Sequence, residues 1–186
     1  LMSKDYLISI ITVVKNGETT IERCIKSVLN QNYKNIQYII INGNSIDGTK
    51  KIIEKYKDKI HSIVCENDEG IWDAMNKGIK LVKGEIVGFL NADDFYYPDS
   101  LKIVNNYFNK NKIDFLFGTV KKYKLMHGFN PSIIKWSFGF YTSHSIGFFI
   151  KTEKHKMVGL YNSKYYSADL DFFYKMIVNF NLKGIS

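Results

Sequence analysis

The sequence predicts an α/β fold in which a mostly parallel central sheet is flanked by helices. Two observations predict it. Short apolar segments rich in β-branched residues alternate with segments whose apolar residues recur every three to four positions, and this alternation builds parallel sheets with helices on both faces. The first apolar segment, Tyr6 to Val14, is dense enough in Ile and Val for a strand that is buried on both faces.

The predicted elements follow one another along the first two-thirds of the chain. After the Asn16-Gly17 turn, apolar residues at positions 21, 24, 25, 28 and 29 form one face of a helix. The same reasoning then predicts, in order, a strand over residues 36–41, a helix around 52–56, a strand over 60–65, a helix around 71–79, a strand over 86–90, a helix that opens at Pro98, and a strand over 113–117.

The pattern changes after Gly118. Residues 145–150 form another strand candidate, and residues 170–180 carry a continuous apolar and aromatic helical pattern. Gly184 is expected to cap that helix, with a further strand about to begin. We therefore expect a single domain over residues 1–186, with a nucleotide-type half (1–118) and an appended half (119–186), in a chain that continues beyond its last residue.

The composition excludes several classes of protein. Hydrophobic residues make up 45% and aromatic residues 15% of the 186 positions, as in a packed globular protein. No segment approaches the ~20 apolar residues of a membrane-spanning helix, and the N-terminal segment lacks the layout of a signal peptide. Cys24 and Cys65 are too few for a disulfide scaffold, fit a reducing cytoplasmic compartment, and are expected to be buried thiols.

The chain carries a formal net charge of +8, which favours anionic partners. Nucleic acid, anionic lipid headgroups and nucleotide phosphates all qualify by charge alone. The lysines are dispersed and no nucleic-acid-binding motif accompanies them, so solvated helix faces explain them better than nucleic acid does. The dinucleotide-binding and phosphate-binding glycine fingerprints are both absent, which argues against a dinucleotide oxidoreductase and a P-loop NTPase.

Polar side chains come at or after the ends of four consecutive predicted strands. Thr12 lies near the end of the first and Asn42 at the end of the second, Asp68 follows the third, and Asp93 and Asp94 follow the fourth. Ligands of such sheets bind beyond the carboxyl ends of the strands, so this edge is the candidate site. No run of arginines lies near the two adjacent carboxylates, and Mg²⁺ or Mn²⁺ is their natural partner, together with the phosphates of a substrate.

Structural roles are alternatives for these acids. Asp93 and Asp94 could complement the dipole of the following helix, although Asp99 and Ser100 already supply capping residues there. Asp47 could do no more than start the second helix.

A second acidic pair lies late in the chain, at Asp169 and Asp171. Residues two apart on a helix point in different directions, so at most one of them should face the site. Asp169, near the helix start, is either a general base or an acid that complements the helix dipole.

Five segments, in order and at matching spacings, resemble one known family: ISIITVVKN, INGNSIDGT, NDEGIWDAMNKGI, GEIVGFLNADD and SADLDFF. Over residues 7–181 they resemble the family 2 glycosyltransferases with the GT-A fold, especially bacterial enzymes of surface-polysaccharide biosynthesis. The resemblance implies a Rossmann-like, mostly parallel sheet with a smaller acceptor-side region. It implies a hexosyl- or N-acetylhexosaminyl-transferase that moves a sugar, with inversion, from a nucleotide-sugar donor (a UDP-sugar is favoured) to a hydroxyl of a glycan or lipid-linked glycan.

The resemblance also implies roles for individual residues. Asp94 would bind Mn²⁺ or Mg²⁺ as part of a DXD-type motif, and Asp93 would contact the metal or the ribose. The positions that line the nucleotide-sugar pocket of the family are here Thr12, Asn42, Asp68 and Asn76. Asp169 matches the general base. His144 matches a recurrent histidine near the donor or the acceptor, with a packed loop histidine as the alternative.

Three departures from the family pattern keep other readings open. Asn42 stands where Asp is usual, Ala168 stands where Glu is frequent, and the chain ends soon after the last helix. A catalytically degenerate domain that serves as a binding module is one alternative. A sugar nucleotidyltransferase ranks lower, since TVVKNGETT has one Gly and one Lys where such enzymes carry a Gly-rich basic loop. Peripheral association with the inner face of the cytoplasmic membrane is compatible with the basic surface.

Overall fold

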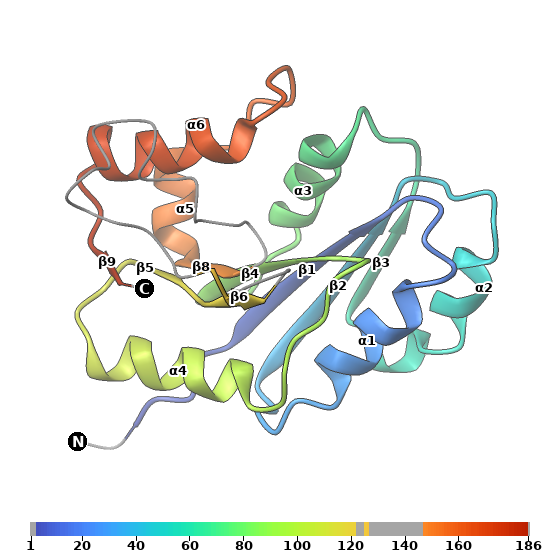
Figure 1. Ribbon diagram of the computed structural model, residues 1–186, viewed down its shortest axis with the longest axis horizontal. Helices are drawn as coiled ribbons and strands as arrows, with labels where there is room; N and C mark the ends of the chain where they lie inside the picture. The colour runs from blue at the N-terminus through green and yellow to red at the C-terminus, as the bar shows by residue number, and fades with distance from the viewer. Residues whose placement is uncertain (1–2, 122–124, 127–146, 186) are drawn as a thin grey trace.

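The computed structural model (Figure 1) describes residues 3–121, 125–126 and 147–185. Its elements, in chain order, are β1 (Ile8–Val14), α1 (Ile21–Leu29), β2 (Ile36–Asn42), α2 (Thr49–Glu54), a 3₁₀ turn (Lys57–Lys59), β3 (Ser62–Cys65), α3 (Ile71–Ile79), β4 (Ile86–Asn91), α4 (Ser100–Lys110), β5 (Phe115–Phe117), β6 (Val120–Lys121), β7 (Leu125–Met126), β8 (Phe148–Lys151), α5 (Thr152–Val158), α6 (Ala168–Tyr174), a π-helical segment (Lys175–Asn179) and β9 (Gly184–Ile185).

The central sheet has seven strands in the order β3-β2-β1-β4-β8-β5-β9. All neighbouring strands run parallel except β8, which is antiparallel to both β4 and β5. β6 and β7 pair separately as a short antiparallel ribbon. The prediction of an α/β fold with a mostly parallel sheet is confirmed, and the sheet contains strands from both halves of the chain.

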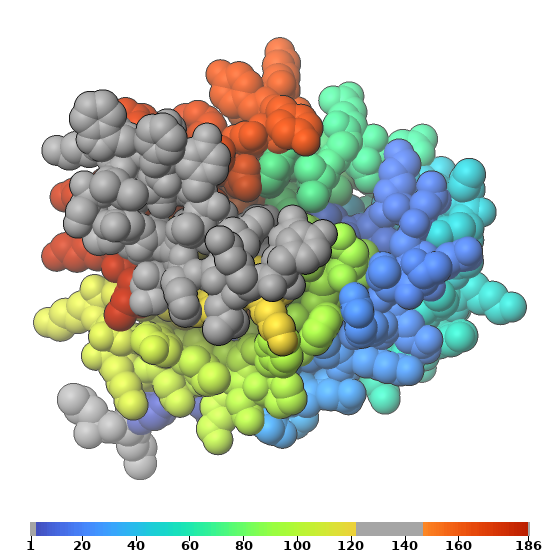
Figure 2. Space-filling view, viewed as in Figure 1, coloured from blue at the N-terminus to red at the C-terminus, as the bar shows by residue number. Residues whose placement is uncertain are grey.

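Helices cover both faces of the sheet, so that the molecule has two cores (Figure 1). α1, α2 and α4 bury side chains such as Cys24, Ile53 and Phe108 against one face, and these form the first core. α3 and α6 bury Met75 and Phe172 against the other face, and these belong to the second core. In Figure 2 orange residues from late in the chain and the green α3 lie toward the top, and the yellow-green α4 lies toward the bottom.

Several predicted boundaries and placements were wrong. α4 begins at Ser100, because Asp99 before it adopts a left-handed backbone with φ 64°. Gly184 is not a helix cap but part of β9, where a side-chain Cβ would lie 2.0 Å from the ring of Phe115. Cys65 is exposed, because it ends β3 at the edge of the sheet, whereas Cys24 is buried as predicted.

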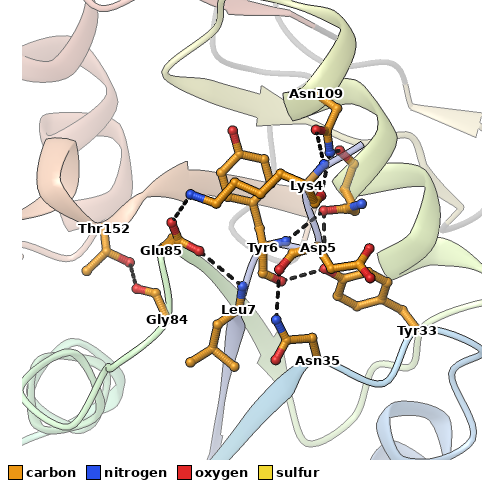
Figure 3. A network of polar contacts seen from close by, with 11 residues as sticks. Lys4, Asp5, Tyr6, Leu7, Tyr33, Asn35, Gly84, Glu85, Asn109 and Thr152 are labelled. Carbon is orange, nitrogen blue, oxygen red and sulfur yellow. Dashed lines mark hydrogen bonds and ion pairs between the residues drawn. The ribbon is translucent and has the colours of Figure 1, made fainter. Parts of the chain in front are cut away.

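A polar network joins the elements at the edge where β1 and β4 begin (Figure 3). Lys4 forms an ion pair with Glu85, and the Glu85 backbone N–H donates to the carbonyl of Leu7 at 2.8 Å. The Thr152 hydroxyl donates to the carbonyl of Gly84 at 2.6 Å, so α5 is held at the same place. The polar groups at this edge therefore bond to one another within the chain, and the opposite edge carries the pocket described below.

In the described residues no helix is long and apolar enough to cross a membrane.

One histidine is buried in the second core. His155 of α5 is 1% exposed, and its ring stacks on Phe172 with the ring centroids 4.5 Å apart. Neither of its ring nitrogens has a hydrogen-bond partner among the residues that the structure describes. Burial disfavours the charged imidazolium and lowers the pKa of His155 to about 3.

The stability of the protein is expected to fall as the pH decreases from about 6.5 toward 3. The pKa of His155 is 6.5 in its unperturbed form and about 3 in the folded protein, so over this range the unfolded state binds one more proton. The free energy of unfolding then falls by up to about 1.4 kcal/mol per pH unit from this residue. His155→Leu removes this contribution, and its stability should depend less on pH. Urea unfolding at about pH 7, 6 and 5 measures both slopes; equal slopes would contradict the prediction.

Candidate nucleotide-sugar site

A pocket of about 450 Å³ lies at the carboxyl ends of the strands, as predicted for this fold class. Three segments line it: the end of β1 with the loop after it, the segment that leads into α3, and the end of β4. The lining residues include Lys15, Asn16, Gly17, Thr20, Asp68, Gly70, Ile71, Ala74, Asn91 and Asp93. The structure thus brings the predicted residues Asp68 and Asp93 to one pocket.

The loops after β1 and β2 are held together by hydrogen bonds, and one side chain that makes them is Asn42, a predicted pocket residue. The Asn42 Oδ1 atom accepts hydrogen bonds from the Ser45 backbone N–H at 3.0 Å and from its hydroxyl at 2.6 Å. The Ser45 hydroxyl oxygen in turn accepts from the backbone N–H of Asn16 at 2.8 Å. Asn42 is 1% exposed. It therefore acts on the pocket through Ser45 and Asn16.

Asp47 joins the same two loops. One of its carboxylate oxygens accepts from the backbone N–H of Thr49 at 3.0 Å, and the other accepts from that of Glu18 at 3.1 Å. The hydrogen bonds from Thr49 and Glu18 help to hold the pKa of Asp47 below its usual value. Because α2 begins at Thr49, the bond from its backbone N–H agrees with the alternative in which Asp47 starts the second helix.

Asp68 forms one wall of the pocket and lies directly against the loop after β2. A Cβ atom on Gly43 would lie 2.0 Å from a carboxylate oxygen of Asp68, so a side chain at position 43 would displace that carboxylate. The other carboxylate oxygen accepts from the backbone N–H of Gly70 at 3.2 Å. Gly70 has φ 110°, a conformation that favours glycine, and α3 begins at the next residue.

The opposite wall is the turn that follows β4. The backbone N–H of Asp94 donates to the carbonyl of Asn91 at 3.0 Å. The Arg23 guanidinium donates to the carbonyl of Asp93 at 2.8 Å and lies 4.8 Å over the ring of Phe95. Asp93 is exposed, and its carboxylate accepts no hydrogen bond from the described residues. The Asn91 Oδ1 atom is buried and likewise has no hydrogen-bond partner among the described residues.

The carboxylates at this turn fit a divalent cation that takes some of its ligands from the protein and the others from a substrate. In the described part of the chain no three His, Cys, Asp or Glu side chains gather as a metal cage. Mg²⁺ is usually held by one or two carboxylates together with substrate phosphates, and Mn²⁺ also favours oxygen ligands. Asp93 and Asp94 supply two adjacent carboxylates, with Asp93 on this pocket and Asp94 on a second pocket that also contains Asp93.

Thr12 lies inside the first core and away from the lining of the pocket. It is completely buried, and its hydroxyl lies 3.1 Å from the Tyr38 hydroxyl and 3.7 Å from the Cys24 sulfur. Burial raises the pKa of Tyr38 well above its usual value. The structure therefore gives Thr12 a place in a buried hydrogen-bonded group under α1.

Asn76 joins α3 to the segment before α6. Its side-chain amide donates to the carbonyl of Tyr161 at 2.8 Å, and its oxygen accepts from the backbone N–H of Tyr161 at 2.9 Å. The Trp72 indole N–H donates to the carbonyl of Tyr166 at 3.1 Å. These bonds hold the beginning of α6 beside the beginning of α3 (Figure 1).

Asp169 lies in the first turn of α6, next to this junction. Its carboxylate accepts from the backbone N–H of Leu170 at 2.9 Å. Burial, and then the negative charge of Asp169, raise the pKa of the Tyr161 hydroxyl well above its usual value. Asp171 pairs with Lys175 at 2.7 Å, on another side of the helix. His144 lies outside the described residues.

The fold agrees with what comparison with known proteins finds. The sequence profile described as "Glycosyl transferase family 2" matches residues 9–168. The chain belongs to this family. The resemblance on which the site residues were assigned is therefore confirmed.

The curated relatives of this family 2 glycosyltransferase are longer proteins. WfgD of Escherichia coli, a "UDP-Glc:alpha-D-GlcNAc-diphosphoundecaprenol beta-1,3-glucosyltransferase", is 34% identical over 115 residues, which are 61% of this chain and 46% of WfgD. The chain spans only 32% of the length of two glycosyltransferases of Rickettsia that it also matches.

Solved glycosyltransferase structures share the fold. TarS of S. aureus in complex with UDP has a TM-score of 0.77 at 22% identity, over 92% of this chain and 55% of that one. The mannosyltransferase PcManGT of Pyrobaculum calidifontis, in complex with GDP-Man and Mn²⁺, has a TM-score of 0.78 at 17% identity, over 97% and 54%. At these identities the likeness shows the fold, which is the GT-A fold of this family.

Sequence analysis placed Lys15 and Asn16 at this edge but missed other residues that line the pocket. Gly17 lines it after β1, and Gly70 and Ile71 bring the start of α3 to it. The Asn16-Gly17 pair was a usable signal, because Asn16 adopts φ 53°, a left-handed conformation that Asn tolerates better than most residues.

Asn76→Ala is expected to destabilise this glycosyltransferase without changing the binding of a nucleotide. Both hydrogen bonds to the Tyr161 backbone are lost, which costs about 1–3 kcal/mol and lowers the melting temperature by several degrees. UDP should still raise the melting temperature by the same increment. Asn111→Ala, which removes one hydrogen bond at the end of α4, is the matched control with a smaller effect. An unchanged melting temperature together with a lost response to UDP would instead place Asn76 on the donor.

Proposed function

We propose that this domain binds a nucleotide-diphosphate sugar, with a UDP-sugar favoured, and transfers the sugar with inversion to a hydroxyl of a glycan or lipid-linked glycan. One observation carries the proposal: in a family 2 glycosyltransferase, one pocket at the strand ends is bounded by Asp68 on one side and Asp93 on the other. The relative WfgD uses UDP-Glc, and the structural neighbour TarS binds UDP.

The pocket offers complementary groups to the nucleoside and the diphosphate of such a donor. The Asp68 carboxylate, which lies against Gly43, is an acceptor for the N–H or hydroxyl groups of a nucleoside. Lys15, which is exposed and lines the pocket, supplies positive charge for a diphosphate. The beginning of α3 also lines the pocket, and the N-terminus of a helix favours anions.

Asp93 and Asp94 would hold Mn²⁺ or Mg²⁺ in this proposal, and such an ion, when bound, neutralises the diphosphate leaving group. The neighbour PcManGT contains Mn²⁺ together with GDP-Man, which supports a divalent cation for this fold. The protein's own contribution is the tight turn after β4, which Arg23 holds at the carbonyl of Asp93.

Asp169 is the proposed general base. Its place in the first turn of α6, which Trp72 and Asn76 hold beside α3, puts a carboxylate near the segment that lines the pocket. Asp169 would take the proton of the acceptor hydroxyl, and the oxygen would attack the anomeric carbon of the sugar from the side opposite the nucleotide. The bond from that carbon to the diphosphate would break, the nucleoside diphosphate would leave, and the configuration would invert.

A lipid-linked acceptor and a peripheral position at the inner face of the cytoplasmic membrane belong to the same proposal. WfgD acts on a diphosphoundecaprenol-linked sugar. The turn before α6 exposes Tyr165 and Tyr166 next to Lys164, and Tyr166 is 99% exposed. Aromatic and basic side chains together suit the interface of an anionic membrane.

UDP with Mn²⁺ is expected to raise the melting temperature of the protein by about 5–10 °C at a hundredfold excess over the dissociation constant. Asp93→Asn and Asp94→Asn should abolish the part of this shift that depends on Mn²⁺, because they remove the negative charge that holds the ion. Asp58→Asn, the same change at an exposed acid on the turn Lys57–Lys59, is the control. The donor-site proposal fails if UDP, GDP and dTDP all leave the melting temperature unchanged with Mn²⁺ present.

Asp169→Asn is expected to reduce sugar transfer by about 10²–10⁴-fold while the melting shift with UDP and Mn²⁺ stays unchanged. The amide keeps the size of the side chain but cannot take the proton of the acceptor. Release of UDP from a panel of UDP-sugars, with and without glycan acceptors, measures transfer. Asp171→Asn, which changes the acid two residues further along the helix, should keep activity. Retained transfer in Asp169→Asn would overturn the assignment of the base, and no transfer by the unaltered protein would favour a degenerate binding module.

A further inference from the structure

A second pocket of about 400 Å³ lies on the other side of the turn that follows β4. The segment after the two aspartates, one side of α4, the residues at β5 and β6, and the start of β8 enclose it. Leu90, Leu116 and Phe149 line it and belong to the first core, so this pocket lies on the face of the sheet that α4 covers. Asp93 lines both pockets, and their occupants would therefore be neighbours.

Four large apolar side chains that are exposed to solvent line this second pocket. Phe95, Tyr97, Ile103 and Tyr107 are 42%, 52%, 51% and 41% exposed, respectively. Ile103 and Tyr107 are four residues apart and share one side of α4, whereas the core side of that helix carries other residues. Exposed apolar side chains that gather at one place mark a binding surface better than scattered ones do.

Phe95 and Tyr97 form an aromatic wall of this pocket, and contacts of Phe95 hold it in shape. The rings of Phe95 and Tyr97 meet edge to face, with centroids 5.5 Å apart. The Arg23 guanidinium lies over the Phe95 ring and holds the same turn through the carbonyl of Asp93. The wall is thus formed before any ligand arrives, which reduces the entropy that binding has to overcome.

Polar side chains lie around the aromatic wall. The pocket is also lined by Asp93, Asp94, Ser100, Thr119 and Lys121. An apolar, aromatic lining with a small number of polar groups is typical of small-ligand pockets in this range of volumes. A pyranose ring matches it: its C–H face packs on aromatic rings, and its hydroxyls bond to carboxylate, hydroxyl and ammonium groups. A lipid chain would cover the charged groups with hydrocarbon and give them no hydrogen bonds.

We propose that this second pocket is an accessory carbohydrate subsite, which binds a sugar unit of the acceptor glycan other than the one that reacts. This inference rests on the proposed function. The reacting hydroxyl belongs with Asp169, on the helix layer of α3 and α6, whereas the second pocket lies on the α4 face. An acceptor that extends past the shared Asp93 would reach both places, so the pocket would select acceptors with more than one sugar.

Saturation-transfer NMR with simple glycosides tests the subsite. The probes are the methyl β-glycosides of glucose, galactose and N-acetylglucosamine, and methyl β-cellobioside and methyl β-lactoside, each with UDP and the diamagnetic ion Mg²⁺ in excess. At least one probe should receive saturation at its ring C–H protons while UDP is bound. Tyr107→Ala should weaken its binding about 2- to 10-fold, and Tyr107→Phe should restore it, because the aromatic face is what binds.

Two controls separate the subsite from the donor site. Tyr174→Ala removes a similarly exposed tyrosine, 47% exposed, from α6 and should leave glycoside binding intact. Tyr107→Ala should keep the full melting shift with UDP and Mn²⁺. The subsite is refuted if no probe binds, if Tyr107→Ala binds as tightly as the unaltered protein, or if UDP displaces the glycoside. Glycoside binding in a protein that does not respond to any nucleotide would support the subsite and overturn the proposed donor.

Discussion

The site depends on the parallel register of β1 with its two neighbours. Val14 at the end of β1 lies opposite Asn42 of β2, and Val13 lies opposite Asn91 of β4. All three strands therefore end at the same level, and the loops that follow them open at one edge of the sheet. A shift of one residue in either pairing would turn the buried side chains of that strand to the other face. The two cores fix the register, and the register fixes the pocket.

Many polar residues at this edge form hydrogen bonds with other residues of the chain. From the sequence alone such residues resemble ligand contacts, and some of them were assigned to a ligand. The strand pattern predicted the sheet, the edge and the approximate place of Asp68 and Asp93, because these follow from apolar periodicity and chain direction. It did not show that Asn42 bonds to Ser45, or that Asn76 bonds to the backbone of Tyr161. Such partners are close in space but distant in sequence, and residue type alone does not reveal them.

The boundaries that sequence analysis misplaced have local causes of the same kind. Pro98 predicted the start of α4 two residues early, because Asp99 adopts a left-handed backbone conformation before the helix begins. The Asp99 carboxylate accepts a hydrogen bond from the Asn32 amide instead of capping the helix. Gly184 resembled a helix cap but is required by the ring of Phe115 from another strand. A glycine can serve backbone conformation or close packing, and only the neighbours in space distinguish the two.

The turn after β4 shows how the fold leaves a carboxylate available to a ligand. Arg23 is the only arginine of the chain, and it binds the carbonyl of Asp93 and the ring of Phe95 rather than a carboxylate. An ion pair with Asp93 would have neutralised the group that lines both pockets. Because the turn is held through its backbone and an aromatic ring, its shape does not depend on the charge of Asp93. The same contact thereby orders the wall of the second pocket, so one side chain of α1 supports both binding places.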